Sequence, residues 1–430
     1  MGSGLFALLL RALTWWQAAA LAVAALVFNV VALPRIGGRR LYRPIDDVRG
    51  SPIGIILYPL SVLLLILIFP SRLDIAAAAW AILAFGDGAA TLVGRGVVTA
   101  PLPWNGEKTI GGTVAFILCG GAAAIAFELW TRPSVVPEPG LMFAIAAPMA
   151  AATAAAFVET IPARLDDNIS VPAAAGAVLW VASLASSQAI DASRGAVVAH
   201  LPWALGVNAV IAWLGYRAGT VSLSGTIGGA IVGTIIFAAG GWRAWTMLFV
   251  TFAVASIASR LGLRRKVLLG IAEERGGRRG AGNAIANCGV AAIAAVVAVT
   301  AGHTTAAWIA FVAALTAGGS DTVASEIGKA WGRSTFLVST LRLVRPGTPG
   351  AMSLEGTAAG VVAALGLASV GVALGLIVSA TVIAIVIGAT AGALLESALG
   401  ATLEPAGILN NDMLNFINTA AAAAVTLALT

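Results

Sequence analysis

Long apolar stretches, separated by short polar loops, run through the whole chain. Runs of roughly 17–25 apolar residues are each long enough to cross a bilayer as a helix, and none alternates between apolar and polar residues as a barrel strand does. Hydropathy read in windows gives about fourteen spans, at approximately 16–33, 53–70, 75–93, 112–131, 141–162, 171–187, 196–216, 223–240, 242–260, 282–301, 304–320, 356–376, 378–397 and 409–429. The pattern therefore predicts an all-α, polytopic bundle of transmembrane helices.

The composition excludes an ordinary soluble domain. Of the 430 residues, 59% are hydrophobic and only 10% are charged, whereas about a quarter of a soluble domain is charged. Cys119 and Cys288 lie within or near spans and predict neither a disulfide framework nor a zinc site. The net charge of +6 comes from the loops, so we expect it to report orientation in the lipid bilayer, and we expect no nucleic-acid partner.

Basic residues gather in alternate loops. Twenty of the 25 Lys and Arg residues fall in one set of loops, and the other set holds Arg11, Arg72, Arg132, Arg194 and Arg243. An excess of Lys and Arg marks the cytoplasmic side of a membrane protein. We therefore predict an integral, multi-pass protein whose basic loops, and the acidic motifs beside them, face the cytoplasm, with a prokaryotic inner membrane as the expected location.

An acidic residue among glycines ends one span in each half of the chain. Asp87 lies in residues 85–95 (FGDGAATLVGR), and Asp321 lies in residues 318–329 (GGSDTVASEIGK). In both stretches a glycine and then a basic residue follow the acid seven residues later. A carboxylate at membrane depth is costly and points to function by default, so the double occurrence predicts two related sites.

The first six spans align with the last six. In both sets the third span ends in the acidic stretch, the fourth opens with Gly-Thr, the fifth ends in a glutamate, and a polar triplet opens the sixth. These features are Gly112-Thr113, Glu159 and Asp166-Asp167-Asn168 in the first set, and Gly356-Thr357, Glu396 and Asn410-Asn411-Asp412 in the second. Because the offset is even in spans, we predict two parallel repeats of about six spans with an extra pair between them, in units 1–190 and 191–430.

Carboxylates on one side of the membrane predict a metal site in each half. Mg²⁺ prefers carboxylates, waters and phosphate oxygens. The candidate metal ligands are Asp87, Glu159, Asp166, Asp321, Glu355, Glu396 and Asp412. A carboxylate can also accept the proton of an attacking hydroxyl, and the candidate catalytic residues are Asp87, Asp167, Asp321 and Glu326.

Glycines, helix starts and basic residues near these acids predict phosphate binding. Backbone N–H groups and helix N-termini bind anions, and Mg²⁺, amides and cations around a phosphate chain are what phosphoryl transfer requires. The candidates for nucleotide or phosphate binding are Gly86, Arg95, Lys108, Thr109, Gly112, Thr113, Asn168, Arg345, Gly347, Thr348, Gly350, Ser353, Gly356 and Thr357.

Plainer interpretations of the same residues stay open. Glycines in spans often serve helix packing, and a lone Lys108, Arg95 or Arg345 is an orientation charge. Asp166 alone is a helix cap, and Asp87 alone is an ion-path residue.

Three motifs of the first half match a known family. They are Gly86-Asp87-Gly88-Ala89-Ala90 through Gly94-Arg95, Lys108-Thr109 through Gly112-Thr113, and Glu159 followed by Asp166-Asp167-Asn168 before Pro172. Over roughly residues 50–185 the chain thereby resembles the polyprenol kinase family, which includes dolichol kinase and phytol kinase and is related to the phosphatidate cytidylyltransferases. Gly111 stands where that family usually has a glutamate.

The second half carries different motifs. They are Asn283 through Asn287-Cys288-Gly289, Asp321 through Gly328, Arg345-Pro346-Gly347-Thr348-Pro349-Gly350, and Ser353-Leu354-Glu355-Gly356-Thr357. Over roughly residues 200–430 the chain is similar to a family typified by phytyl-phosphate kinase of plants and cyanobacteria and by a widespread uncharacterised membrane protein.

The two resemblances imply a fusion of enzymes that act in succession. The first would phosphorylate phytol or a similar prenyl alcohol, and the second would convert the monophosphate to the diphosphate. The resemblance also implies CTP as phosphate donor, with Mg²⁺. The expected partners are the lipid substrate, a nucleoside triphosphate and the bilayer, and a homodimer is left open. Two alternatives remain: cytidylyltransferase-like synthesis of a CDP-lipid, and a secondary transporter with intramembrane carboxylates.

Overall fold

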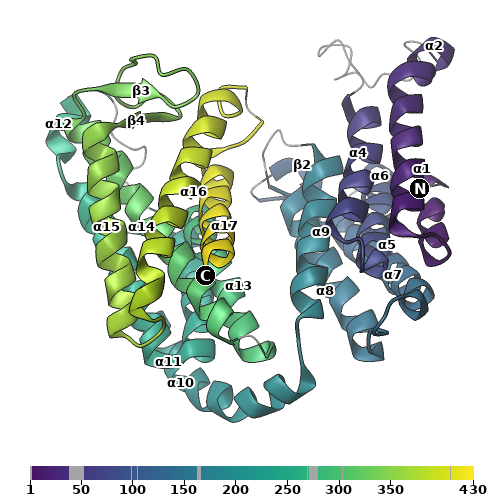
Figure 1. Ribbon diagram of the computed structural model, residues 1–430, viewed down its shortest axis with the longest axis horizontal. Coiled ribbons are helices and arrows are strands. Elements are labelled where there is room, and N and C mark those ends of the chain that lie inside the picture. Colours follow the sequence, from purple (N-terminus) through teal and green to yellow (C-terminus); the bar gives the residue numbers. More distant parts are fainter. Residues whose placement is uncertain are drawn as a thin grey trace. The chain divides into compact units, whose positions relative to one another are not determined.

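The computed structural model describes residues 2–37, 53–97, 99–103, 105–161, 166–268, 270, 279–302, 304–406 and 408–430 (Figure 1). These residues are mostly helical. The chain forms two compact units, Met1–Leu184 and Ala185–Thr430.

The first unit consists of helices with one short β-hairpin. Its elements are a 3₁₀ helix Gly2–Arg11, α1 Trp15–Val27, π-helical turns Phe28–Ala32, α2 Leu33–Gly37, α4 Ile53–Ile68, α5 Leu73–Ala81, π-helical turns Ile82–Gly86, α6 Asp87–Gly96, β1 Pro101–Leu102, β2 Asn105–Thr109, α7 Ile110–Thr131, a 3₁₀ turn Arg132–Ser134, α8 Leu141–Glu159 and α9 Asp167–Ser183. Buried alanines of α5 and α8 form much of its core, and small side chains let these helices pack closely.

The second unit has the same kinds of element. They are α10 Ser187–Arg217, α11 Leu223–Arg260, α12 Leu263–Leu268, α13 Ala281–Thr300, α14 Thr304–Trp331, β3 Thr335–Leu337, β4 Ala351–Ser353, α15 Leu354–Ala373, a 3₁₀ turn Ser379–Thr381, α16 Val382–Thr402 and α17 Asn411–Leu429. Helix α14 lies inside this unit and packs against α11, α13, α15, α16 and α17 (Figure 1). Its residues Phe311–Leu315 are fully buried or nearly so.

Eleven helices among the described residues are long and apolar enough to cross a membrane. The chain is therefore an integral, multi-pass helical membrane protein, with a span count that differs from the predicted figure of about fourteen. The difference arises at α4 and α9, which have 16 and 17 residues, and at α11, where two predicted spans meet without a loop. A hydrocarbon core of about 30 Å calls for roughly 20 helical residues, so α4 and α9 are short for full spans.

Helix α11 contains a break at Gly241. The backbone there has φ 60° and ψ −154°, inside an otherwise helical run of 38 residues. This conformation is open essentially only to glycine. A Cβ at this position would also lie 3.0 Å from the ring of His200 on α10. The predicted spans 223–240 and 242–260 therefore adjoin at a bend in one element.

Two antiparallel hairpins depart from the all-helical expectation. β1 pairs with β2, and β3 pairs with β4 in the register Thr335–Ser353, Phe336–Met352 and Leu337–Ala351. Each hairpin runs directly into a capped helix. The Thr109 hydroxyl accepts a hydrogen bond from the Gly112 N–H at 3.2 Å, and the Ser353 hydroxyl accepts one from the Gly356 N–H at 3.0 Å. A side-chain cap of this kind fixes where a helix begins, here where α7 and α15 begin.

Candidate functional sites

Three carboxylates meet in the first unit. Asp87 begins α6, Glu159 ends α8 and Asp167 begins α9, and one oxygen from each lies within 4.8 Å of the others. The ammonium of Lys108 on β2 lies 2.6 Å from Glu159 Oε1 and 3.2 Å from Asp167 Oδ2. Residues from four separate elements therefore form one acidic cluster, in which Lys108 donates hydrogen bonds to two of the three carboxylates.

The hairpin holds Lys108 in place. The Asn105 side chain donates a hydrogen bond to the Thr160 carbonyl at 3.1 Å, which ties β2 to the end of α8. Burial by itself would lower the pKa of the Lys108 ammonium, but the charges of Glu159 and Asp167 outweigh it, and the pKa lies above its usual value. Lys108 is therefore charged at neutral pH and partly neutralises the cluster.

Other predicted residues of this unit do not belong to the group of three acids. Asp166 caps α9, because its Oδ1 accepts hydrogen bonds from the Asn168 N–H at 3.0 Å and the Asn168 side chain at 2.7 Å. The structure therefore brings Asp167, and not Asp166, to the other two acids. A Cβ at Gly86 would lie 2.9 Å from the Phe116 ring, which indicates helix packing. Arg95 is exposed at the end of α6.

The start of α7 is packed closely against α6. A Cβ at Gly112 would lie 3.2 Å from the Ala90 carbonyl oxygen, so a glycine lets the two helices approach there. Thr109 caps α7, and the Thr113 hydroxyl donates a hydrogen bond back to the Thr109 carbonyl at 3.1 Å. A Cβ at Gly111 would lie 2.7 Å from the Thr99 side chain, so a glutamate could stand there only if Thr99 moved.

The second unit contains a polar cavity of about 300 Å³. Asp321 and Lys329 line it from α14, Glu396 from α16 and Asn415 from α17. Eight of the residues predicted from the sequence line its walls: Asp321, Gly347, Thr348, Gly350, Ser353, Gly356, Thr357 and Glu396. The cavity therefore gathers acids, a cation, hydroxyls and glycines from one side of the unit.

The segment between β3 and β4 closes one wall of this cavity. The Thr348 N–H and hydroxyl both donate to the Arg345 carbonyl, at 3.2 and 2.7 Å, and Gly350 has φ 70°. A Cβ at Gly350 would lie 2.2 Å from the Ala401 nitrogen and 2.4 Å from the Ser397 carbonyl oxygen. The turn therefore packs its backbone directly on the end of α16, beside Glu396.

Acidic residues of α16 and its following loop have distinct partners. Glu396 Oε2 accepts a hydrogen bond from the Asn418 side chain at 2.8 Å. Glu404, just beyond α16, also lines the cavity, and burial raises the pKa of its carboxyl. Helix α17 thus positions Glu396, while Glu404 was not among the residues singled out in the sequence.

Four predicted residues do not line the cavity. Glu326 is 2% exposed and forms ion pairs with Lys266 of α12 and with Lys329, whose Nζ lies 3.2 Å away. Arg345 is exposed, Asp412 lies beside Gly282 at the start of α13, and Glu355 Oε2 is buried without a hydrogen-bond partner among the described residues. Among those residues, a group of three acids close enough to share an ion is present in the first unit alone.

Arg279, Asn283 and Asn287 line the polar cavity and were missed as site residues. The two asparagines lie four residues apart on α13 and therefore share one helix face. Asn287 donates a hydrogen bond to the Asn283 carbonyl at 3.0 Å. Paired amides one turn apart in an apolar span are the signal in the sequence, whereas nothing sets Arg279 apart from the other basic residues of its loop.

The fold and these cavities define a multi-pass helical membrane protein with polar, acid-lined sites at the ends of its helices. Residues 206–423 match the family described as Integral membrane protein DUF92. The match spans about half of the chain, and the chain belongs to this family.

Three relatives extend the comparison. The chain is 40% identical over 200 residues to an uncharacterised membrane protein of Synechocystis sp., covering 46% of this chain and 78% of that protein. It is 34% identical over 205 residues to protein VTE6, chloroplastic, of Arabidopsis thaliana, covering 46% of this chain and 62% of that protein. It is 30% identical over 141 residues to "Probable phytol kinase 1, chloroplastic" of Glycine max, covering 32% of this chain and 45% of that protein. The chain thus spans less than two thirds of either plant protein, and no solved structure matches it.

Proposed function

We propose that the chain is a membrane-embedded kinase of isoprenoid lipids with one site in each unit. The first unit phosphorylates a prenyl alcohol such as phytol, and the second converts the prenyl monophosphate to the diphosphate. The observation that carries the proposal is the polar cavity of the second unit, in which Asp321, Glu396, Lys329 and the turn 346–350 surround one space. Similarity to a probable phytol kinase supports the choice of substrate.

Mg²⁺ fits the acidic cluster of the first unit. Asp87, Glu159 and Asp167 offer three carboxylate oxygens in one place, which is the donor set that Mg²⁺ takes together with water and phosphate oxygens. In the second unit Asp321 and Glu396 line one cavity and are the residues that would hold the ion. A bound Mg²⁺ would neutralise charge on the phosphates of the donor, for which we propose CTP from the resemblance of both units to CTP-using families.

The first reaction needs a proton acceptor. An alcohol that attacks the terminal phosphorus of the nucleotide forms an O–P bond, breaks the bond between that phosphorus and the β-phosphate oxygen, and loses its proton to a base. Lys108 pairs with Glu159 and Asp167, whereas the described residues give Asp87 no ion pair. We therefore assign the acceptor role to Asp87.

The second reaction has a different requirement. A phosphate monoester has its second pKa near about 6, so at neutral pH most of the substrate already carries an unprotonated oxygen that can attack. The second site consequently needs cations and N–H groups more than a base. Lys329, Arg279 and the backbone of the turn 346–350 line the cavity and are suited to that task.

The two units share an order of elements that supports a parallel repeat. In each, a helix with the key aspartate leads to an antiparallel hairpin, then to a helix capped by a hydroxyl that binds the third N–H, then to a helix with a glutamate near its end. The shared order is also the basis for proposing that two related enzymes are joined in one chain. The distribution of basic loops supports the proposal that each site opens to the cytoplasm.

Transfer of radiolabelled phosphate tests the proposal. Purified full-length protein would be incubated with γ-labelled CTP or ATP and Mg²⁺, with phytol, phytyl monophosphate or farnesol as acceptor. We expect labelled monophosphate from the alcohols, labelled diphosphate from the monophosphate, and CDP as co-product. Pyrophosphate release with a CDP-lipid would identify a cytidylyltransferase instead. No nucleotide turnover by folded protein with any acceptor would leave the transporter alternative.

A further inference from the structure

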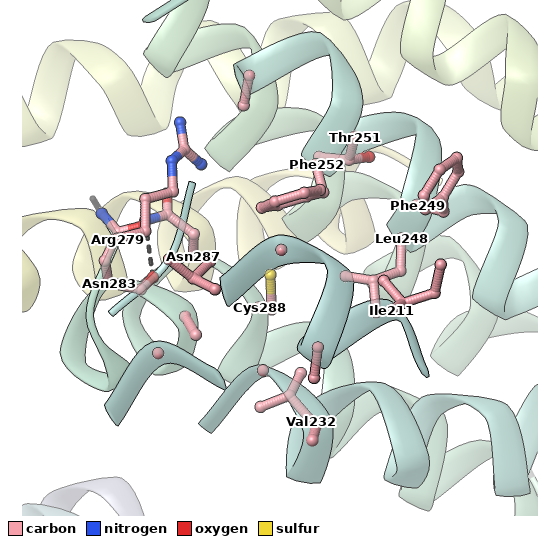
Figure 2. Close-up of a pocket in the computed structure, with 18 of the residues that line it drawn as sticks. Ile211, Val232, Leu248, Phe249, Thr251, Phe252, Arg279, Asn283, Asn287 and Cys288 are labelled. Atoms are coloured by element: carbon pink, nitrogen blue, oxygen red, sulfur yellow. Dashed lines mark hydrogen bonds between the residues drawn. The ribbon is translucent and has the colours of Figure 1, made fainter. Parts of the chain in front are cut away.

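A second, apolar cavity of about 140 Å³ lies in the second unit between α10, α11, α13 and α14. Figure 2 shows its lining. Ile211, Val232, Leu248 and Phe249 gather on one side, whereas Arg279, Asn283 and Asn287 lie together on the other. The space is therefore apolar along most of its wall and polar at one end.

The polar end is shared with the cavity that contains Asp321. Arg279, Asn283 and Asn287 line both spaces. A molecule that fills the apolar cavity with a hydrocarbon chain would therefore have its head group at this shared wall, next to the acids, cation and glycines of the polar cavity.

Arg279 is built into the wall. Its N–H donates to the Thr220 carbonyl at 3.1 Å, and its own carbonyl accepts from the Ser222 N–H at 3.0 Å. Its guanidinium donates to the Ser259 hydroxyl at 3.2 Å. An arginine fixed at the boundary between an apolar and a polar cavity suits a phosphate head group, because guanidinium is always charged and binds phosphate oxygens in a fork.

We propose that the apolar cavity, which has room for about six carbons, holds the end of the isoprenoid tail next to the phosphate of the lipid monophosphate, with the phosphate at Arg279, Asn283 and Asn287. This inference rests on the proposed function, because it gives the second site its acceptor. The aromatic and aliphatic walls exclude a nucleotide from this space, since the phosphates and sugar would lose their hydration without partners. The nucleotide is left to the polar cavity, and the tail reaches that cavity from the side of α11 and α13.

Gly229 on α11 offers a direct test. It lines the apolar cavity and does not line the polar one, and the position of its Cβ is open space to 4 Å. Gly229→Leu therefore fills the cavity without a clash at the Cβ, and leucine is also the better helix former. Gly366→Leu is the matched control, because Gly366 lies on α15, lines neither cavity and likewise has open space at its Cβ.

The measurement is equilibrium binding of phytyl monophosphate and of inorganic phosphate, which has no tail, to full-length protein in lipid nanodiscs. Each methylene that loses its apolar surroundings weakens binding about fourfold, so exclusion of two or more should weaken phytyl monophosphate binding by about tenfold or more in Gly229→Leu. Inorganic phosphate should bind Gly229→Leu as it binds the wild type, and Gly366→Leu should leave both affinities unchanged.

Unchanged phytyl monophosphate affinity in Gly229→Leu, absent binding to the wild type, or an equal loss for both ligands would each overturn the inference. Transfer assays on the same preparations separate the two proposals. The expected binding pattern without phosphate transfer would overturn the kinase proposal alone. Transfer to phytyl monophosphate with an unaltered KM in Gly229→Leu would overturn the cavity assignment alone.

Discussion

Asp87 and Asp321 belong to different units and, under the proposed function, serve different reactions. Asp87 lies with Glu159 and Asp167, and Asp321 lines the cavity of the second unit. Asp87→Asn should lower phosphorylation of the alcohol by about a hundredfold or more, the range of general base catalysis, and leave conversion of the monophosphate intact. Asp321→Asn should do the reverse, so that monophosphate accumulates. Chromatography of labelled lipids after incubation with phytol would show both patterns.

Asp191→Asn is the matched control for this pair, since Asp191 is exposed on α10 and lies outside both sites. Loss of both reactions from either single change, in protein that still folds, would mean one composite site instead of two.

Glu326 lies in a motif predicted to be catalytic, and we expect its ion pair with Lys266 to stabilise the fold. It is buried with Lys266, which is 2% exposed and also donates to the Ser259 carbonyl at 2.9 Å. Removal of Lys266 leaves the buried carboxylate with the more exposed Lys329 as its remaining ion-pair partner, so the loss should stay below the about 3–5 kcal/mol that an unpaired buried charge typically costs. Lys266→Met should therefore lower the melting temperature of the protein in detergent clearly, with the kinetics of the surviving folded fraction unaltered.

Arg264→Met, at an exposed position of the same helix, should leave the melting temperature unchanged. Lys266→Met combined with Glu326→Leu should recover part of the loss, because no unpaired charge then remains buried. A melting temperature equal to wild type in Lys266→Met would show that the ion pair contributes nothing.

The acidic residues of each motif can be recognised from the sequence, but the directions in which their side chains point cannot. Asp321 and Glu326 lie five residues apart on α14, which is about 1.4 helical turns, so they point to different faces: Asp321 lines the cavity and Glu326 meets α12. The same reason explains why Asp167, and not the predicted metal ligand Asp166, lies with Asp87 and Glu159. Adjacent residues at a helix start point in different directions, and Asp166 caps the helix. Arg345 stays a predicted phosphate ligand whose exposed side chain lies outside the cavity wall.

At the scale of elements, hydropathy predicted the helices well and the hairpins not at all. Strands of two to five residues carry no periodic signal, and β1 and β4 lie in segments rich in proline and glycine. The predicted spans 223–240 and 242–260 match the two helical segments of α11 on either side of Gly241, although a window does not show that they meet at one glycine without a loop. Pairing between distant strands and the angle of a bend depend on tertiary contacts, which a window does not contain.

The turn 346–350 lines the polar cavity, so we expect its conformation to affect activity at the second site. At Gly350, φ is 70° and the backbone lies against Ser397 and Ala401. Gly350→Ala should therefore displace the turn from α16, at a cost of about 1–3 kcal/mol in local strain. We expect conversion of the monophosphate to fall by tenfold or more by the same energy scale, while phosphorylation of the alcohol in the first unit continues.

Gly302→Ala serves as the comparison, because Gly302 lies in a loop of the same unit, lacks a positive φ and has open space at its Cβ. Both reactions should match the wild type in that variant. An active Gly350→Ala protein would show that the turn does not shape the site.

At the scale of the whole molecule, orientation in the membrane is open to a direct measurement. In a chain with Cys119 and Cys288 replaced by serine, a cysteine at exposed Arg342 should react with an impermeant maleimide only after the cytoplasmic side is opened. A cysteine at Val136, which is 93% exposed in the loop before α8, should react in intact cells. Labelling of position 342 in intact cells would reverse the orientation.

Gly241 carries a consequence at the level of the gene. Every single-base change that replaces a glycine codon by another amino acid introduces a residue with a Cβ. At this position φ is 60° and any Cβ would lie 3.0 Å from the His200 ring, so each such residue strains the backbone of α11. Only synonymous single-base changes of this codon therefore preserve the bend. In a saturation library selected for function, position 241 should tolerate synonymous changes alone, although it lies in no motif and lines neither cavity.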